Sequence, residues 1–347
     1  MDIKNDGRTH ELTARQWVDC ARMAEECGFD SVWMNEDVGH DSFMILALAA
    51  QATTRVEVGT AIVNVFHRSA MQMAMGFATL DEVSNGRAVL GLSSGHEPWN
   101  NLYHGIPIEA PLTRVREYAT FIKKAVTGES FEHEGRIFKG VKSRLAFHPL
   151  RQHLPVYVAG VLPGMIKVAG QVGDGLLTNV VPASYIAGFA AKHLADSAAA
   201  AGRDPASLEL MAVITCSVSD DPREALDRAR ETFLWRQNAG PNKMIKTFSP
   251  EFHDELTYLS RLAAEGEGAR AQREASPQLV SQVVPHGTGA DVWKGVEKFF
   301  DAGCTRVALA PYPRDEAHVK RLLEAVGPFV SRAAASVPSP IAMGEAR

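Results

Sequence analysis

Two hydrophobic patterns alternate along this 347-residue chain. Short, continuously apolar runs predict buried strands, and the longer segments between them carry apolar residues at helical spacing. The predicted strands are 31–34, 56–65, 88–92, 156–159, 175–179, 208–218 and 306–310, and the N-terminal run 1–4 would bring them to eight. Strands that alternate with helices form a parallel sheet with helices outside, so eight such units predict a (β/α)8 or TIM barrel.

The predicted helices fill the intervals between the strands. The first presents Trp17, Ala21, Ala24 and Cys27 on one face and ends at Gly28, because glycine readily adopts the left-handed conformation that stops a helix. The others are predicted at 69–84, 112–127, 163–172, 183–201, 221–238, 289–302 and 315–333.

Two segments interrupt the alternation. Apolar and polar residues alternate around Gly135, which makes 129–146 a predicted hairpin. The segment 240–286 is long and polar, with a helix expected near 251–264, and such a stretch in a compact domain is typically a lid or an insertion. We therefore expect one barrel domain over residues 1–347 that carries these two insertions.

Composition narrows the function classes. Lys and Arg number 36 against 41 Asp and Glu, a net charge of -5, so the basic surface that nucleic-acid binding requires is not expected. The longest apolar run, 43–50, is far shorter than the ~20 residues of a membrane-spanning helix, and the first residues lack the apolar core of a signal peptide. A cytoplasmic location is the resulting expectation. The four cysteines have neither CxxC nor zinc-ligand spacing and are expected to be buried thiols.

Several common site motifs are missing from the sequence. It has no GxGxxG after a strand, no phosphate-binding glycine-lysine loop, no HExxH and no GxSxG. The pairs His96-Glu97 and His133-Glu134 have no third ligand at a useful spacing, so no metal site is expected.

Small and polar residues follow the predicted strand 88–92. Ser93, Ser94 and Gly95 would allow a ligand to lie against the backbone, since glycine has no Cβ and serine can donate or accept hydrogen bonds. His96 comes next, at the strand end where barrel enzymes place active groups. It either acts on a bound ring or substrate, or it caps the following helix. Glu36 and Asp37 likewise act as acid and base or are solvated loop charges.

A glycine-rich turn follows the strand 156–159. Gly160, Val161, Gly164 and Met165 surround Pro163 at the start of a predicted helix. Backbone N–H groups and the positive end of the helix dipole would then point at one place, which suits a phosphate. The alternative from these residues alone is a tight turn between strand and helix.

These segments together resemble the bacterial luciferase-like oxidoreductases, most closely the branch that contains methylenetetrahydromethanopterin reductase. The resemblance is carried by 28–37, 58–68, the helix-to-strand stretch 80–96, and 155–175. Many relatives have an Asp-His pair where this chain has Glu36 and Asp37, so the histidine is replaced.

The resemblance implies specific site residues. It places a cis peptide between Ala61 and Ile62, in a bulge behind the cofactor ring. It makes a phosphate-binding loop of the turn at Gly160–Met165. It also assigns cofactor contacts to a wider set of residues, namely Ala61, Ile62, Asn64, Ser93, Ser94, Gly95, Gly160, Val161, Gly164 and Met165, with His96, Glu36 and Asp37 as catalytic candidates.

The resemblance also implies an activity. The chain would be an oxidoreductase that uses FMN or the deazaflavin coenzyme F420 to move a hydride to or from a small organic substrate. One alternative is an FMN-dependent monooxygenase that uses oxygen, with a separate flavin or deazaflavin reductase as the partner that supplies the reduced cofactor. Another is a non-catalytic flavin-binding protein. A Schiff-base lyase or isomerase is disfavoured, because only Lys4 stands at a predicted strand end. A homo-oligomer, dimer or tetramer, is expected.

Overall fold

The computed structural model describes residues 12–36, 38–96, 100–237 and 241–336. The strands in these ranges are β1 (Ser31–Met34), β2 (Glu57–Thr60), β3 (Val63–Asn64), β4 (Ala88–Ser93), β5 (Phe131–His133), β6 (Val141–Ser143), β7 (Val156–Ala159), β8 (Gly175–Asn179), β9 (Glu209–Val218), β10 (His286–Gly287) and β11 (Arg306–Pro311). All seven internal strands predicted from the apolar runs are present, and the run 1–4 lies outside the described residues.

Helices alternate with these strands. They are α1 (Ala14–Glu26), α2 (Ser42–Ala52), α3 (Ala70–Val83), η3 (Asn100–His104), α5 (Pro111–Ala125), α6 (Pro163–Val172), α7 (Ala183–Tyr185), η4 (Ile186–Ala190), α8 (Ala191–Ala200), η5 (Pro205–Ser207), α9 (Pro222–Gln237), α10 (Pro241–Phe248), η6 (Pro250–Phe252), α11 (His253–Ala264), α12 (Gly268–Glu274), α13 (Pro277–Val280), α14 (Gly289–Asp301) and α15 (Glu316–Ser336). Side chains set several helix starts: Thr13, Ser69 and Thr288 each form a reciprocal capping box, which satisfies N–H groups that the first turn leaves unpaired.

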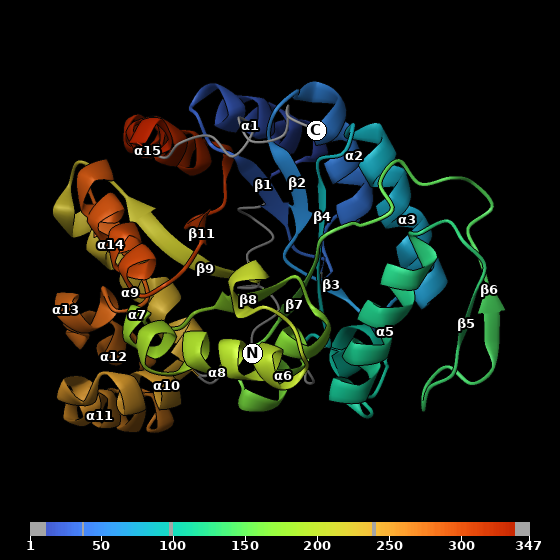
Figure 1. Ribbon diagram of the computed structural model, residues 1–347. Helices are drawn as coiled ribbons and strands as arrows, with labels where there is room; N and C mark the ends of the chain where they lie inside the picture. The colour runs from blue at the N-terminus through green and yellow to red at the C-terminus, as the bar shows by residue number, and fades with distance from the viewer. Residues whose placement is uncertain (1–11, 37, 97–99, 238–240, 337–347) are drawn as a thin grey trace.

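All the strands except β5 and β6 form one parallel sheet wrapped by helices (Figure 1). Its order is β1-β2-β4-β7-β8-β9-β10, with β3 beside β4 and β11 beside β9. The alternation of strand and helix, the parallel ladders and the helical shell make this an α/β fold of the predicted barrel type. Within the described residues no ladder joins β1 to β11.

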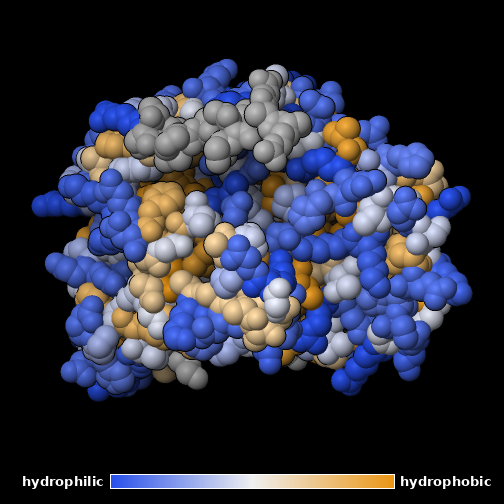
Figure 2. Space-filling model, viewed as in Figure 1, coloured by the Kyte–Doolittle hydropathy of each residue, from blue (hydrophilic) through white to orange (hydrophobic). Residues whose placement is uncertain are grey.

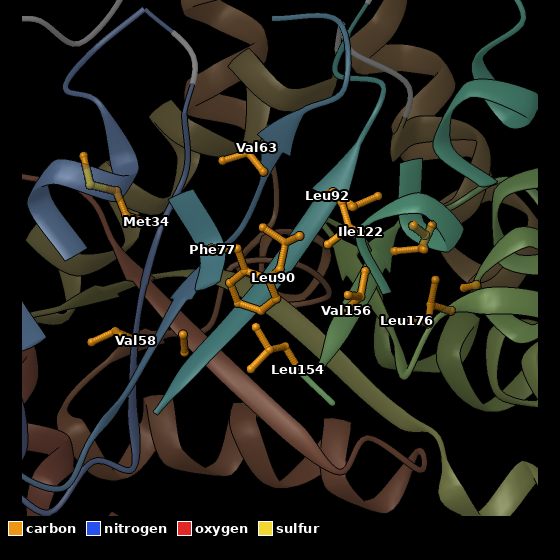
Figure 3. Packing of buried hydrophobic residues seen from close by; sticks show 14 of the residues in the cluster. Met34, Val58, Val63, Phe77, Leu90, Leu92, Ile122, Leu154, Val156 and Leu176 are labelled. Carbon is orange, nitrogen blue, oxygen red and sulfur yellow. The ribbon is translucent and has the colours of Figure 1, made fainter. Parts of the chain in front are cut away.

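The outward side of the sheet carries the main core. Leu90 of β4 packs beside Phe77 of α3 and Leu154, and Val156 and Leu176 continue this layer along β7 and β8 (Figure 3). The inward side holds a smaller cluster formed by Val89, Tyr157, Ala159, Leu177 and Met211, with Trp33, Ala61, Ile62, Val213 and Ala308 packed against it. Alternate residues of each strand therefore face the helices and the barrel interior.

Three segments differ in detail from the sequence prediction. The run 56–65 divides into β2 and β3, because the chain bulges between Thr60 and Val63. The predicted helix 183–201 is interrupted by the π-helical η4. Helix α2 was not predicted, since its eleven residues are almost uniformly apolar and lack a helical polar face.

Both segments that interrupt the alternation have secondary structure of their own. Strands β5 and β6 pair antiparallel as the expected hairpin. Helices α10 to α13 occupy the second segment and pack with α9 around a separate cluster that includes Phe233, Leu259 and Leu279. The hairpin and these helices lie on opposite sides of the molecule (Figure 1). Figure 2 shows a mainly hydrophilic outline, with hydrophobic side chains gathered nearer the middle of this face.

Candidate functional site

The predicted site residues follow the carboxyl ends of neighbouring parallel strands. Glu36 comes after β1, the pair Ala61 and Ile62 after β2, His96 after β4, and Gly160 after β7. Because these strands are parallel and adjacent in the sheet, their carboxyl ends meet at one rim of the barrel, which is where enzymes of this architecture hold their active sites.

The bulge after β2 has the predicted backbone. The peptide between Ala61 and Ile62 is cis. Ala61 donates its N–H to the Met34 carbonyl at 2.8 Å, and the Ile62 carbonyl accepts the Glu36 N–H at 2.9 Å. These bonds extend the β1–β2 pairing past the last ladder residue and hold Ala61 and Ile62 against the interior cluster. The bulge is thus an anchored wall on the inner side of the rim.

Glu36 is the centre of a charged network. Its Oε1 accepts Arg68 Nε at 3.0 Å and its Oε2 accepts Arg68 Nη2 at 2.8 Å, while Ser42 donates its hydroxyl to Oε2 at 2.8 Å. Arg68 also reaches Asp41 Oδ2 at 2.6 Å. Burial alone would raise the pKa of Glu36, but the bonds from Arg68 and Ser42 outweigh it and hold that pKa below its usual value. An ionised carboxylate that accepts hydrogen bonds on both oxygens can orient its neighbours, but it has no proton to donate.

Asp37 was predicted beside Glu36 as a second catalytic candidate. Asp37 lies outside the described residues. Its proposed catalytic role therefore stays a prediction from the sequence.

Asn64 takes part in a polar cluster that supports the loop after β4. Its Nδ2 donates to Asn100 Oδ1 at 2.7 Å, and its Oδ1 accepts the Phe66 N–H at 2.9 Å. Nδ2 also lies 3.2 Å from His67 Nε2. The His67 ring lies against that of His104, with centroids 3.7 Å apart and the ring planes tilted by 32°. Burial, together with nearby His104, lowers the pKa of His67, which favours a neutral ring.

The loop after β4 lies directly on this cluster. Ser93 donates its hydroxyl to the Ala159 carbonyl at 2.7 Å, so the ends of β4 and β7 are joined. Gly95 has φ of +67°, and a Cβ there would lie 2.2 Å from Asn64 Nδ2, so only glycine fits. Ser94 is half-buried, and His96 is exposed with its carbonyl accepting the Asn100 N–H at 3.1 Å. The rim therefore brings Ser93, Gly95 and His96 beside Asn64.

The turn from β7 into α6 is equally compact. Gly160 donates its N–H to the Leu177 carbonyl at 2.9 Å, and a Cβ on Gly160 would lie 2.4 Å from Met165 Cγ. Tyr185 donates its hydroxyl to the Val161 carbonyl. Helix α6 then begins at Pro163 with no side-chain cap from Leu162.

These features fit a phosphate-bearing cofactor. The ten-residue helix α6 starts without a side-chain cap, so the positive end of its dipole is open to an anion. Gly160 and Gly164 let the turn pack closely on Met165 and Leu112, because a Cβ at either position would meet those side chains at under 3 Å. The interior cluster beside the bulge supplies an apolar surface for a flat ring.

Sequence reasoning missed three residues at this rim. Arg68 pairs with Glu36, Asn100 bonds Asn64, and the ring of His67 contacts that of His104. Arg68 and His67 lie within the segment 58–68 that carries the family resemblance, so the sequence could have indicated them. Asn100 is separated from Asn64 by 36 residues, and no local pattern connects the two. Among the residues that the structure describes, no group of three or more His, Cys, Asp or Glu could hold a metal ion.

The sequence and the fold both match known proteins. A family profile described as luciferase-like monooxygenase matches residues 2–306. The chain is 28% identical over 290 residues, 83% of this chain and 87% of the relative, to a 5,10-methylenetetrahydromethanopterin reductase of Methanolobus tindarius. It is 27% identical to an F420-dependent glucose-6-phosphate dehydrogenase of Kineococcus radiotolerans, covering 86% of this chain and 88% of that protein.

A solved structure has the same fold. The coenzyme F420-dependent tetrahydromethanopterin reductase from Methanopyrus kandleri superposes with a TM-score of 0.79, at 21% sequence identity, over 92% of this chain and 97% of that one. Its likeness supports the barrel assignment.

Proposed function

The chain belongs to the luciferase-like monooxygenase family as an oxidoreductase that uses FMN or F420, and from that premise we propose that F420 is its cofactor. Two similar proteins are named as F420-dependent. The cofactor supplies the hydride acceptor or donor when it is bound. The substrate is a small organic molecule, and the reaction is hydride transfer.

One observation carries the proposal: the bulge at Ala61 and Ile62 packs against the interior cluster at the same rim as the uncapped start of α6. We propose that Ile62 and Ala61 support the ring, and that the turn Gly160–Met165 binds the phosphate. Ser93, Ser94 and Gly95 would line the ring between them. The walls exclude water and fix which ring face meets the substrate, which lowers the orientational cost of reaction.

The charged residues are proposed to position this site. Arg68 holds Glu36 in its ionised form, so Glu36 would orient the loop that follows β1 and accept hydrogen bonds from the ring. His96 and Asp37 remain the candidates for proton transfer to the substrate. Neutral His67 and Asn100 support Gly95 through Asn64.

A titration tests the cofactor assignment. Purified protein is titrated with F420, FMN and NADPH, and binding is followed by fluorescence. We expect F420 to bind at micromolar affinity or better and NADPH to bind poorly, because the sequence has no GxGxxG loop. Tight NADPH binding without any F420 or FMN signal would contradict the proposal.

The alternative that uses oxygen is separated by turnover. If FMN binds tightly and F420 does not, reduced FMN-loaded protein is mixed with oxygen and candidate substrates. Oxygen consumption coupled to product formation would favour a monooxygenase, and hydride transfer without oxygen would favour a dehydrogenase or reductase. Binding without turnover would favour a non-catalytic flavoprotein.

We also propose that the chain is a homo-oligomer in which α2 and α3 face a second copy. These adjacent helices carry no charged side chain before Asp81. They expose Met44 by 69%, Leu48 by 52% and Met75 by 48%, and exposed apolar side chains grouped in this way mark interaction surfaces.

None of the helices in the described ranges is long and apolar enough to cross a membrane.

Light scattering tests the association. The parent protein is expected to have at least twice the mass of one chain, and Met44→Glu with Leu48→Glu should shift it toward the monomer. Phe300→Glu, on the exposed side of α14, is the matched control. A monomeric parent protein, or equal shifts for both surfaces, would overturn this assignment.

A further inference from the structure

Two hydroxyl groups on β9 are buried without a hydrogen-bond partner. Thr215 is 4% exposed and Ser217 is 1% exposed, and neither Thr215 Oγ1 nor Ser217 Oγ bonds any atom. Buried polar groups are nearly always paired, so an orphan of this kind calls for a missing partner. Two of them in succession on one strand indicate a shared one.

The strand pattern shows which way these hydroxyls face. Met211 and Val213 of β9 belong to the interior cluster with Tyr157, whereas Cys216 and Val218 pack outward against α14 and α15. Because successive strand residues alternate between faces, Thr215 and Ser217 continue the interior row. They lie beyond Val213, toward the carboxyl end of the strand and the rim.

The opposite wall is the cis bulge. Strands β4, β7 and β8 separate β2 from β9 in the sheet, so the two strands stand across the barrel from each other. Ile62 and Val213 pack against the same interior cluster. Ala61 and Ile62 therefore lie across the interior from β9. On the inward face of β9, the hydroxyls of Thr215 and Ser217 come after the apolar Val213.

The fold satisfies comparable hydroxyls elsewhere. Thr178 of β8 donates to the Met211 carbonyl at 3.2 Å, and Thr60 donates to the Gly91 carbonyl at 2.8 Å. The backbone beside the orphans is also paired, since Ser217 donates its N–H to the Pro285 carbonyl at 3.0 Å. Among the buried hydroxyls of the described residues, only those of Thr215 and Ser217 have no partner.

We propose that Thr215 and Ser217 form the hydrogen-bonding wall of the reaction site and bind a neutral carbonyl or N–H edge. This inference rests on the proposed function. The pyrimidine edge of a flavin or deazaflavin ring has that chemistry, and so does a ketone substrate. A hydroxyl can donate to the carbonyl and accept from the N–H, and neither residue brings a charge that would select an ion.

The test compares the parent protein with Thr215→Val and Ser217→Ala. Thr178→Val is the matched control, since it removes a buried hydroxyl that already has a partner. The melting temperature is measured without ligand. Dissociation constants for F420 and FMN are then measured by fluorescence, and binding of cyclohexanone to the cofactor-loaded protein is followed by saturation-transfer NMR.

Removing an orphan hydroxyl should not harm the free protein, because no bond is lost and a desolvated polar atom is replaced by an apolar one. We expect Thr215→Val to raise the melting temperature and Ser217→Ala not to lower it, whereas Thr178→Val lowers it. Binding should weaken about three- to tenfold per hydroxyl, the effect of one neutral hydrogen bond. Weaker cofactor binding assigns the wall to the ring, and weaker cyclohexanone binding alone assigns it to the substrate.

Other outcomes overturn the inference. A lower melting temperature for Thr215→Val would show a hydroxyl already paired within the protein. Unchanged cofactor and cyclohexanone binding in both variants would show that the wall contacts neither. If the parent protein binds neither F420 nor FMN, the proposed function itself fails, which is distinct from a loss confined to the variants.

Discussion

Single residues set how closely the chain segments approach one another at the rim. Gly95 lies against Asn64 and Gly160 lies against Met165, and in each case a Cβ on the glycine would clash with the neighbouring side chain. The side chains that surround them are equally constrained, since Arg68 bonds both Glu36 and Asp41. The rim is therefore built from small residues at the contact points and from paired charges beside them.

The first prediction concerns Gly160→Ala. The added Cβ would lie 2.4 Å from Met165 Cγ, so either the turn or the start of α6 must shift. Overpacking of this kind costs about 1–3 kcal/mol, and we expect a loss of that size in urea unfolding. Because the displaced turn is the proposed phosphate loop, F420 and FMN binding should weaken as well.

Gly268→Ala is the control for this prediction. Gly268 begins α12, and a Cβ there meets nothing within 4 Å. Alanine is favoured over glycine in a helix by about 0.5–1 kcal/mol, so this variant should be neutral or slightly stabilised. Equal destabilisation by both substitutions would show that the contact with Met165 is not the cause.

At the scale of elements, carboxylates that accept several backbone N–H groups connect neighbouring segments. The hairpin of β5 and β6 is held to α5 by Glu117, whose carboxylate accepts the N–H groups of Arg136 at 2.7 Å, Ile137 at 2.9 Å and Phe138 at 3.0 Å. Phe121 and Phe138 pack beside it with ring centroids 5.5 Å apart. The carboxylate of Glu117 and this aromatic packing together attach the hairpin to α5.

The second prediction is that Glu117→Gln loosens the hairpin. The amide has one acceptor oxygen in place of two, so a backbone N–H loses its partner, at a cost of about 1–3 kcal/mol. Hydrogen exchange at residues 136–138 should accelerate while α5 stays protected. Glu132→Gln is the control, because the Glu132–Lys142 pair is exposed and worth about 0–1 kcal/mol. Unchanged exchange at 136–138 would contradict the anchoring role.

The third prediction concerns the end of α1 and the segment before β2. Burial would raise the pKa of Glu25, but the N–H groups of Val56, Arg55 and Thr54 outweigh it and lower that pKa from 4.5 to about 2. A lowered carboxyl pKa stabilises the fold above pH 4.5, and this contribution is lost as the pH falls from 4.5 toward 2.

Glu25→Gln should therefore destabilise the protein near neutral pH, by about 1 kcal/mol after solvent screening. The difference from the parent protein should shrink as the pH falls below 4.5. Urea unfolding at pH 7, 5, 4 and 3 checks this, with the exposed Glu82→Gln as control. A difference that stays constant with pH would refute the assignment.

At the scale of the whole molecule, charges join strands that are distant in the sequence. Arg306 at the start of β11 bonds Glu57 at the start of β2 and Glu209 at the start of β9. Its guanidinium also lies 5.7 Å from the ring centroid of Trp33. This network lies at the amino ends of the strands, opposite the rim, where barrel residues serve stability.

The fourth prediction is that Arg306→Leu destabilises the fold without changing the site. Its side chain is 16% exposed, and its loss leaves two carboxylates without their cation. We expect about 1–3 kcal/mol in urea unfolding, with cofactor dissociation constants unchanged. Arg321→Leu, whose side chain is 48% exposed, should cost less than about 1 kcal/mol. A large change in F420 binding by Arg306→Leu would show coupling between the two ends.

Much of this structure could be predicted from local features of the sequence. The apolar runs predicted the seven internal strands, and the hairpin at 129–146 and the cis peptide between Ala61 and Ile62 were anticipated by pattern and by family resemblance. Such features depend on neighbouring residues: a strand on its own apolar run, a helix start on its cap, and a glycine turn on the absence of a Cβ.

Contacts across long separations were decided only by the tertiary structure. Nothing in the local sequence pairs Asn64 with Asn100 or Arg306 with Glu57, which lie 36 and 249 residues apart. Whether Glu36 would be a free acid or a bonded carboxylate likewise depended on where Arg68 lies. The same holds for Thr215 and Ser217, since the face of a strand that looks inward is set by how the sheet packs against the helices around it.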